Sequence, residues 1–84
     1  MPDLSVLYFA WLRERVGAPR ESVDSAAPTV AALVEELKGR SEGHALAFSD
    51  LRAVRVAVDQ KLAAMDAPLE GAREVAFFPP MTGG

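Results

Sequence analysis

A single amphipathic helix sets the strongest limit on the fold of this chain. Thr29 is a typical N-cap residue, and four apolar residues follow it at helical spacing, namely Val30, Leu33, Val34 and Leu37. Gly39 ends the pattern. One helix cannot bury its apolar stripe alone, so the rest of the chain must supply a second layer.

Most other apolar segments are short and rich in β-branched or aromatic residues, which favours strands. In the first of them, alternation places Leu4, Val6 and Tyr8 on one face. We predict strands at residues 4–10, 54–58, 62–65 and 74–78, and a weak edge strand at 20–24. We expect turns at 59–61 and 66–71, a short helix at 11–16 ended by Gly17, and irregular structure at 40–49 with one helical turn at 45–48.

This order of elements predicts one α+β domain. The 84 residues leave no room for a second core. One layer of helix on a mixed sheet of four or five strands is a two-layer domain of the β-grasp, or ubiquitin-like, type. We expect the domain to span residues 1–80 and a flexible tail to occupy residues 81–84.

Composition excludes several classes of function. Because the chain has no cysteine, it has no disulfide, thiolate metal site or thiol nucleophile, and the lone His44 cannot form a zinc site unaided. We interpret His44 as a surface residue without a role. The net charge of −3 and the scattered basic residues argue against nucleic acid. No apolar run is long enough to span a membrane and no signal peptide is evident, so we expect a cytoplasmic protein.

Three large apolar side chains have no expected place in the core. If each strand buries one face, alternation leaves Phe9 and Phe78 on the open face, and Leu62 joins them there. Exposed apolar patches usually mark interfaces. Arg13 and Lys61 would flank this patch, and we interpret them as solvated surface charges.

The last residues carry the clearest functional signal. Pro79 and Pro80 cannot donate to a sheet ladder and favour an extended course, so they end the strand at 74–78. Gly83 and Gly84 have no side chains, so this end can thread a narrow channel and present a terminal carboxylate. The alternative is an ordinary frayed terminus.

Three segments together resemble the MoaD family, the small sulfur-carrier subunits of molybdopterin synthase. The specific part is the ending Phe-Phe-Pro-Pro-x-x-Gly-Gly at residues 77–84, and the segments 6–14 and 56–60 extend the likeness along the whole chain. Met81 stands where valine is common in the family, and Asp59 stands where asparagine is frequent.

The resemblance implies a chemistry for the tail. The carboxylate of Gly84, presented with Gly83, would be adenylated with ATP by a MoeB-type enzyme and converted to a thiocarboxylate by a persulfide sulfur donor. The loaded tail would enter a MoaE-type large subunit, within a heterotetramer, and pass sulfur to cyclic pyranopterin monophosphate in molybdenum cofactor biosynthesis.

The resemblance also implies which residues meet partners. The large subunit would supply the catalytic side chains, and this chain would hold no metal and no bound cofactor. The expected partner-binding residues are Phe9, Leu62, Phe78, Pro79, Pro80, Met81 and Thr82.

Two other functions stay open from the sequence. A ThiS-like or Urm1-like carrier or protein modifier shares the diglycine end, and a modifier would finish as an isopeptide on lysines of other proteins. A non-catalytic β-grasp adaptor would have an idle tail. Deletion of Gly84 would leave an adaptor unaffected and would abolish a carrier.

Overall fold

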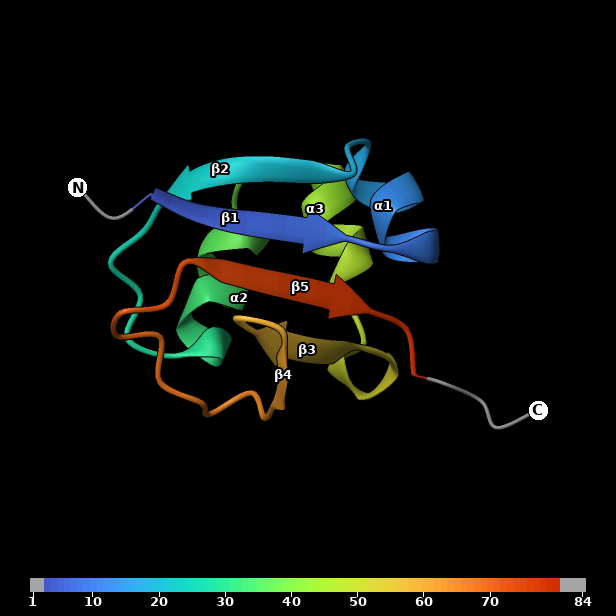
Figure 1. The fold of residues 1–84 in the computed structure, drawn as a ribbon. Helices are drawn as coiled ribbons and strands as arrows, with labels where there is room; N and C mark the ends of the chain where they lie inside the picture. Colours follow the sequence, from blue (N-terminus) through green and yellow to red (C-terminus); the bar gives the residue numbers. More distant parts are fainter. Residues whose placement is uncertain (1–2, 81–84) are drawn as a thin grey trace.

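The computed structural model describes residues 3–80, which form one five-stranded mixed sheet with helices on one face (Figure 1). The strand order is β2-β1-β5-β3-β4. β1 and β5 are parallel, and the other neighbouring pairs are antiparallel. The strands are β1 (Asp3–Tyr8), β2 (Arg20–Asp24), β3 (Arg55–Val58), β4 (Lys61–Ala63) and β5 (Glu74–Phe78).

The helices leave one face of this sheet open. Figure 1 views that open face, with α2 and α3 behind the strands and α1 beside the end of β1. The helical elements are α1 (Ala10–Val16), α2 (Val30–Lys38), α3 (Glu42–Ala47) and a 3₁₀ turn, η1 (Leu51–Ala53). The α+β β-grasp fold expected from the sequence is confirmed, with five strands. None of the helices in residues 3–80 is long and apolar enough to cross a membrane.

Helix α2 follows its sequence pattern closely. The Thr29 hydroxyl accepts a hydrogen bond from the amide of Ala32 at 3.2 Å, which makes Thr29 the N-cap. The first two amides of the helix donate to carbonyls of the loop after β4. The Val30 amide donates to Ala67 at 3.0 Å, and the Ala31 amide donates to Met65 at 2.7 Å. All four residues of the predicted apolar stripe are fully buried.

The core lies between the sheet and these helices. On β1, Leu4, Val6 and Tyr8 are all buried, as the alternation predicted. The Tyr8 ring packs near the rings of Phe48 and Phe77, and the latter two meet edge to face with centroids 4.8 Å apart. This aromatic cluster joins β1 and β5 to the segment that follows α3.

The expectation of mainly irregular structure at 40–49 is wrong, because α3 occupies Glu42–Ala47 and the helical turn predicted at 45–48 is the second half of this longer helix. Ser41 caps this helix by accepting from the amide of His44 at 3.1 Å. Gly43 lies against α1 so closely that a Cβ there would stand 2.2 Å from the Arg15 carbonyl oxygen. The glycine, which looked like an interruption in the sequence, therefore allows the two helices to pack together.

The remaining boundaries differ by a few residues. The first strand ends at Tyr8 because Phe9 serves as the N-cap of α1, where Ala10 has a positive φ of 54°. The strand expected at 62–65 is Lys61–Ala63. The short helix ended by Gly17, the edge strand at 20–24 and the last strand at 74–78 are confirmed.

Candidate functional site

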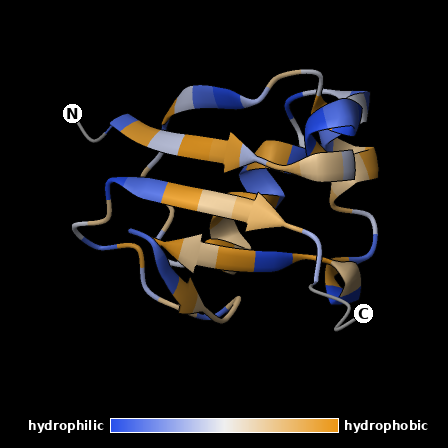
Figure 2. Cartoon of the chain, turned by 45° about the vertical axis from the view of Figure 1, so that its right-hand side comes forward, coloured by the Kyte–Doolittle hydropathy of each residue, from blue (hydrophilic) through white to orange (hydrophobic). Residues whose placement is uncertain are grey.

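The open face of the sheet carries a row of apolar residues that crosses four strands. Strand register places Leu7 on β1 beside Ala76 on β5, Ala76 beside Ala57 on β3, and Ala57 beside Leu62 on β4. These positions alternate with the core-facing ones, so their side chains lie on the face opposite the helices. On that face Ala76 is buried among its neighbours, and Leu7 and Ala57 are half-buried. Leu62 is 78% exposed. Figure 2 shows that hydrophobic residues are common in the middle of β1 and β5.

A second row lies next to it, at the end where the chain leaves the sheet. Tyr8 is the partner of Phe77, and the amide of Phe9 donates to the Phe77 carbonyl at 3.1 Å, so Phe9 and Phe78 extend the same ladder. Phe78 is in turn opposite Arg55 of β3. Phe9 is 47% exposed, whereas Phe78 is half-buried because Phe9 and Arg55 lie on its two sides.

The site therefore combines an apolar face with the exit of the tail. β5 is the central strand, between β1 and β3, so the chain leaves the sheet at the end of its middle strand (Figure 1). Pro79 and Pro80 follow directly and are half-buried. The predicted site residues Met81, Thr82, Gly83 and Gly84, and with them the predicted tail at 81–84, lie outside the described residues.

The structure thus brings the three predicted patch residues Phe9, Leu62 and Phe78 to one face. We name this surface the open-face patch and define it by those three residues with Leu7, Ala57 and Ala76. Sequence reasoning missed the two alanines, because only the strand register shows that they join Leu7 to Leu62. Arg13 and Lys61 are exposed, as expected.

The interpretation of His44 as a surface residue without a role is wrong. Its side chain is buried, with a relative exposure of 7%, and both ring nitrogens have partners. Nε2 lies 2.7 Å from a Glu21 carboxylate oxygen, and Nδ1 lies 2.7 Å from the Ser41 hydroxyl. Because a carboxylate can only accept, Nε2 carries a hydrogen and donates it to Glu21.

Glu21 is the centre of this buried polar cluster. Its register partner on β1 is Val6, so it occupies a core-facing position on edge strand β2. The Tyr8 hydroxyl donates to it at 2.6 Å and Arg40 donates at 3.1 Å, in addition to the bond from His44. One carboxylate therefore holds β1, α3 and the segment after α2 against the edge of the sheet.

The cluster changes the acidity of its members. Burial acts against the charged form of Glu21, but the hydrogen bonds from Tyr8 and His44 and the charge of Arg40 outweigh it, so the pKa of Glu21 lies below its ordinary 4.5. Burial, with the hydrogen bond to Glu21, raises the pKa of the Tyr8 phenol far above its ordinary range. Tyr8 is therefore a permanent donor and Glu21 a carboxylate at neutral pH.

The serine, histidine and glutamate of the cluster have a structural use. The Ser41 oxygen accepts from the His44 amide as the cap of α3 and is also bonded to His44 Nδ1. Both contacts fix the start of α3 on the sheet. Among residues 3–80, no group of three or more histidine or acidic side chains is arranged to hold a metal ion.

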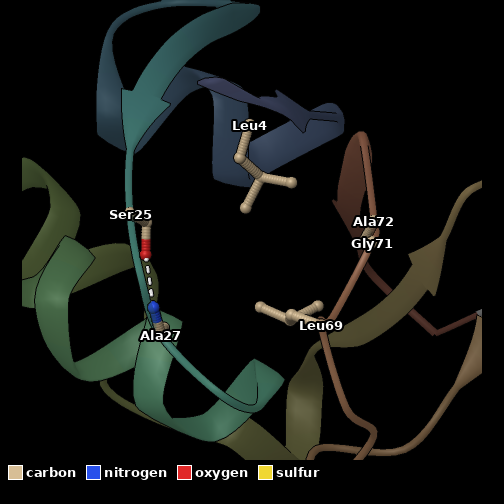
Figure 3. Close-up of a pocket in the computed structure, with 6 residues that line it drawn as sticks. All are labelled: Leu4, Ser25, Ala27, Leu69, Gly71 and Ala72. Atoms are coloured by element: carbon tan, nitrogen blue, oxygen red, sulfur yellow. Dashed lines mark hydrogen bonds between the residues drawn. The ribbon is translucent and has the colours of Figure 1, made fainter. Parts of the chain in front are cut away.

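A small cavity lies at the other end of the sheet, away from the exit of the tail. Its volume is about 150 Å³, and Figure 3 shows its six lining residues, Leu4, Ser25, Ala27, Leu69, Gly71 and Ala72. The Ser25 hydroxyl accepts from the Ala27 amide at 3.1 Å and donates to Glu36 at 2.9 Å. This cavity includes no residue of the predicted site and presents no titratable side chain.

Residues 6–84 match the ThiS family, so the match covers the open-face patch and reaches the final diglycine. The chain belongs to the ThiS family. The chain is also 44% identical over 81 residues to the molybdopterin synthase sulfur carrier subunit of Escherichia coli, and 35% identical over 81 residues to that of Haemophilus influenzae. Both alignments cover 96% of this chain and 99% of the relative. The resemblance to MoaD carriers is confirmed.

Solved structures agree with this family at the level of the fold. The small archaeal modifier protein 1 of Haloferax volcanii has a TM-score of 0.75 and 25% identity to this chain. That comparison covers 96% of this chain and 100% of the archaeal protein.

Proposed function

We propose that this chain is the sulfur carrier subunit of a molybdopterin synthase and that the carboxyl group of its C-terminal Gly84 carries the sulfur. The family match, which runs from the first strand to residue 84, carries the proposal. Curated relatives of almost equal length bear the name of that subunit. The position of β5 in the middle of the sheet supports it, because the tail then starts from a strand that has neighbours on both sides.

The chemistry follows from the terminal carboxylate, which is a poor electrophile until it is activated. A carboxylate oxygen of Gly84 attacks the α-phosphorus of ATP on a MoeB-type enzyme, and pyrophosphate leaves. The terminal sulfur of a persulfide then displaces AMP. A thiol cleaves the resulting S–S bond, which leaves one sulfur on Gly84 as a thiocarboxylate. The chain itself, which has no cysteine, offers no thiol that would intercept the activated end.

The loaded tail then delivers its sulfur inside a MoaE-type large subunit. We propose that the open-face patch docks on that subunit, so that Pro79, Pro80, Met81 and Thr82 span the distance from the sheet to the acceptor, cyclic pyranopterin monophosphate. Catalytic side chains belong to the large subunit in this proposal. The chain binds neither a metal nor a cofactor, and ATP is used by the activating enzyme.

Intact mass spectrometry tests the carrier chemistry. The full chain is incubated with ATP, a MoeB-type enzyme and a sulfur source, and a variant lacking Gly84 serves as the control. We expect a mass gain equal to the replacement of one oxygen by sulfur in the full chain alone. If an activating enzyme that is competent on another carrier produces no gain, the proposal is wrong and the idle-tail adaptor takes its place.

A matched pair of variants tests the docking surface. Leu62→Asp changes the most exposed large apolar residue of the open-face patch, and Leu46→Asp changes one on α3 that is 54% exposed and lies off the sheet. Because both side chains are exposed, stability should change by less than about 0.5 kcal/mol in each. Affinity for the large subunit should fall at least about tenfold for Leu62→Asp only. Equal losses would contradict the assignment of the patch.

One neighbour favours a second function, that of a protein modifier. The archaeal structure bears the name small archaeal modifier protein 1 and shares the fold at 25% identity. A modifier would form an isopeptide between Gly84 and lysines of other proteins. Tryptic peptides with a diglycine remnant on lysine, present with the full chain and absent without Gly84, would identify that function.

A further inference from the structure

Acidic and basic residues of the sheet lie mostly at opposite ends of its strands. At the end away from the tail, Asp3 and Asp24 are direct partners across β1 and β2. At the same end β5 starts with Glu74, and the Asp59 side chain accepts from its amide at 3.0 Å. Figure 2 shows this hydrophilic end at the starts of β1 and β5. The basic residues at this end are Lys61, which is opposite Val58 at the end of β3, and Arg73, which directly precedes Glu74.

The tail end of the sheet has the opposite charge. β2 and β3 both begin there, with Arg20 opposite Leu7 and Arg55 opposite Phe78. Both arginines are exposed and flank the open-face patch. The acidic residue next to Arg20 is Glu21, which points to the core and is bonded to Arg40.

Of the elements that border this end, α1 adds one net positive charge through Arg13 and Arg15 against Glu14. Arg52 of η1 adds none, because it is paired with Asp50. A chain with a net charge of −3 therefore presents a cationic region where its tail emerges.

We infer that the tail end of the open face recognises an acidic protein surface, with Arg20 and Arg55 facing partner carboxylates that surround an apolar contact. The inference rests on the proposed function, since it describes the partner surface that receives the tail. Opposite charge at the two ends of the sheet gives the chain an electric dipole along the strands, and such a dipole orients an approaching protein before contact. If acidic groups surround the channel that receives the tail, this dipole turns the tail end of the chain toward the partner as the two approach.

Association kinetics test this inference with matched charge reversals. Arg20→Glu combined with Arg55→Glu reverses two charges at the tail end. Lys38→Glu combined with Arg73→Glu makes the same net change on α2 and at the far end of the sheet. Binding of each full chain to the large subunit is followed by stopped flow, at about 20 mM and about 1 M salt, where the screening length falls from about 20 Å to 3 Å.

We expect the tail-end reversal to slow association about tenfold at low salt and by less than about twofold at high salt, because steering is screened. The control reversal should change the rate by less than about twofold at either salt. Equal effects of the two pairs, or no effect of either, overturn the inference while the carrier function stands. If loading with ATP fails while association is unchanged, the arginines serve phosphate groups instead and the inference is overturned. If the wild-type chain does not associate at any salt, both proposals fail.

Discussion

Replacement of Glu21 by alanine should destabilise the fold more than its place on an edge strand suggests. Three donors converge on this carboxylate, from Tyr8 at 2.6 Å, His44 at 2.7 Å and Arg40 at 3.1 Å. Tyr8 and His44 are buried, so their donors lose their acceptor without gaining full access to water. Each such donor costs about 1–3 kcal/mol. Since Glu21 is partly exposed, water relieves part of this cost, and we expect a loss of about 3 kcal/mol.

Urea and thermal unfolding followed by circular dichroism measure this loss. For a domain of this size, about 3 kcal/mol lowers the melting temperature by roughly 15 °C. Arg40→Ala is the matched control, because it removes the most exposed of the three donors and should cost less than about 1 kcal/mol. A double-mutant cycle with Tyr8→Phe isolates the Tyr8–Glu21 pair, for which we expect a coupling of about 1–2 kcal/mol. A Glu21→Ala loss no larger than that of Arg40→Ala would refute the reasoning.

The same cluster predicts a pH dependence. The folded-state pKa of Glu21 lies below its ordinary 4.5, so the carboxylate contributes stability that is fully present above that value. This stability is lost as the pH falls below 4.5 and through the folded-state pKa. Wild-type and Glu21→Gln chains should therefore differ most near neutral pH and converge in acid. A difference that stays constant from pH 7 to the acid transition would show that Glu21 does not act through its charge.

Three further changes test single contacts. Gly43→Ala should lower the free energy of unfolding by about 1–3 kcal/mol, because its Cβ would stand 2.2 Å from the Arg15 carbonyl oxygen. Gly39→Ala is the control: its Cβ has only an ordinary contact at 3.5 Å, so urea unfolding should show an unchanged or higher stability. By the same assay, Asp59→Ala should lower the stability by about 1–2 kcal/mol, because Asp59 Oδ1 accepts hydrogen bonds from two backbone amides at 3.0 Å. Asp59→Asn keeps that acceptor and should lower the stability less; equal losses would contradict this account. Ala10→Gly should raise the melting temperature by a few degrees, because glycine tolerates the φ of 54°, and a lower value would show that the strain is absent.

The elements that the sequence predicts well are those whose pattern is local. The stripe of α2 and the alternation of β1 both rest on residues within one segment, and both are confirmed. Only the second half of helix α3 was predicted, as one helical turn at 45–48, because its start depends on a serine cap and its second residue is Gly43, which disfavours helices unless a neighbour requires the space. That neighbour, α1, is far away in the sequence.

The candidate site shows the same division between local and distant information. Alternation alone places Phe9 and Phe78 opposite the core, but the contribution of Ala57 and Ala76 to one continuous row depends on the register of four strands. His44 was misjudged because its partner Glu21 is 23 residues away. Polar residues of that kind look like surface residues until the fold supplies the second half of the pair.

The parallel pairing of β1 with β5 has a mechanical consequence. A pull on the C-terminal end of β5, resisted at the start of β1, acts along both strands in opposite directions. Such a force shears the ladder and loads its hydrogen bonds together, including those from Ser5 to Arg73 at 2.9 Å and from Phe9 to Phe77 at 3.1 Å. The antiparallel ladder with β3 adds resistance on the other side of β5. A partner that holds the tail can therefore draw the protein toward itself without peeling the last strand from the sheet.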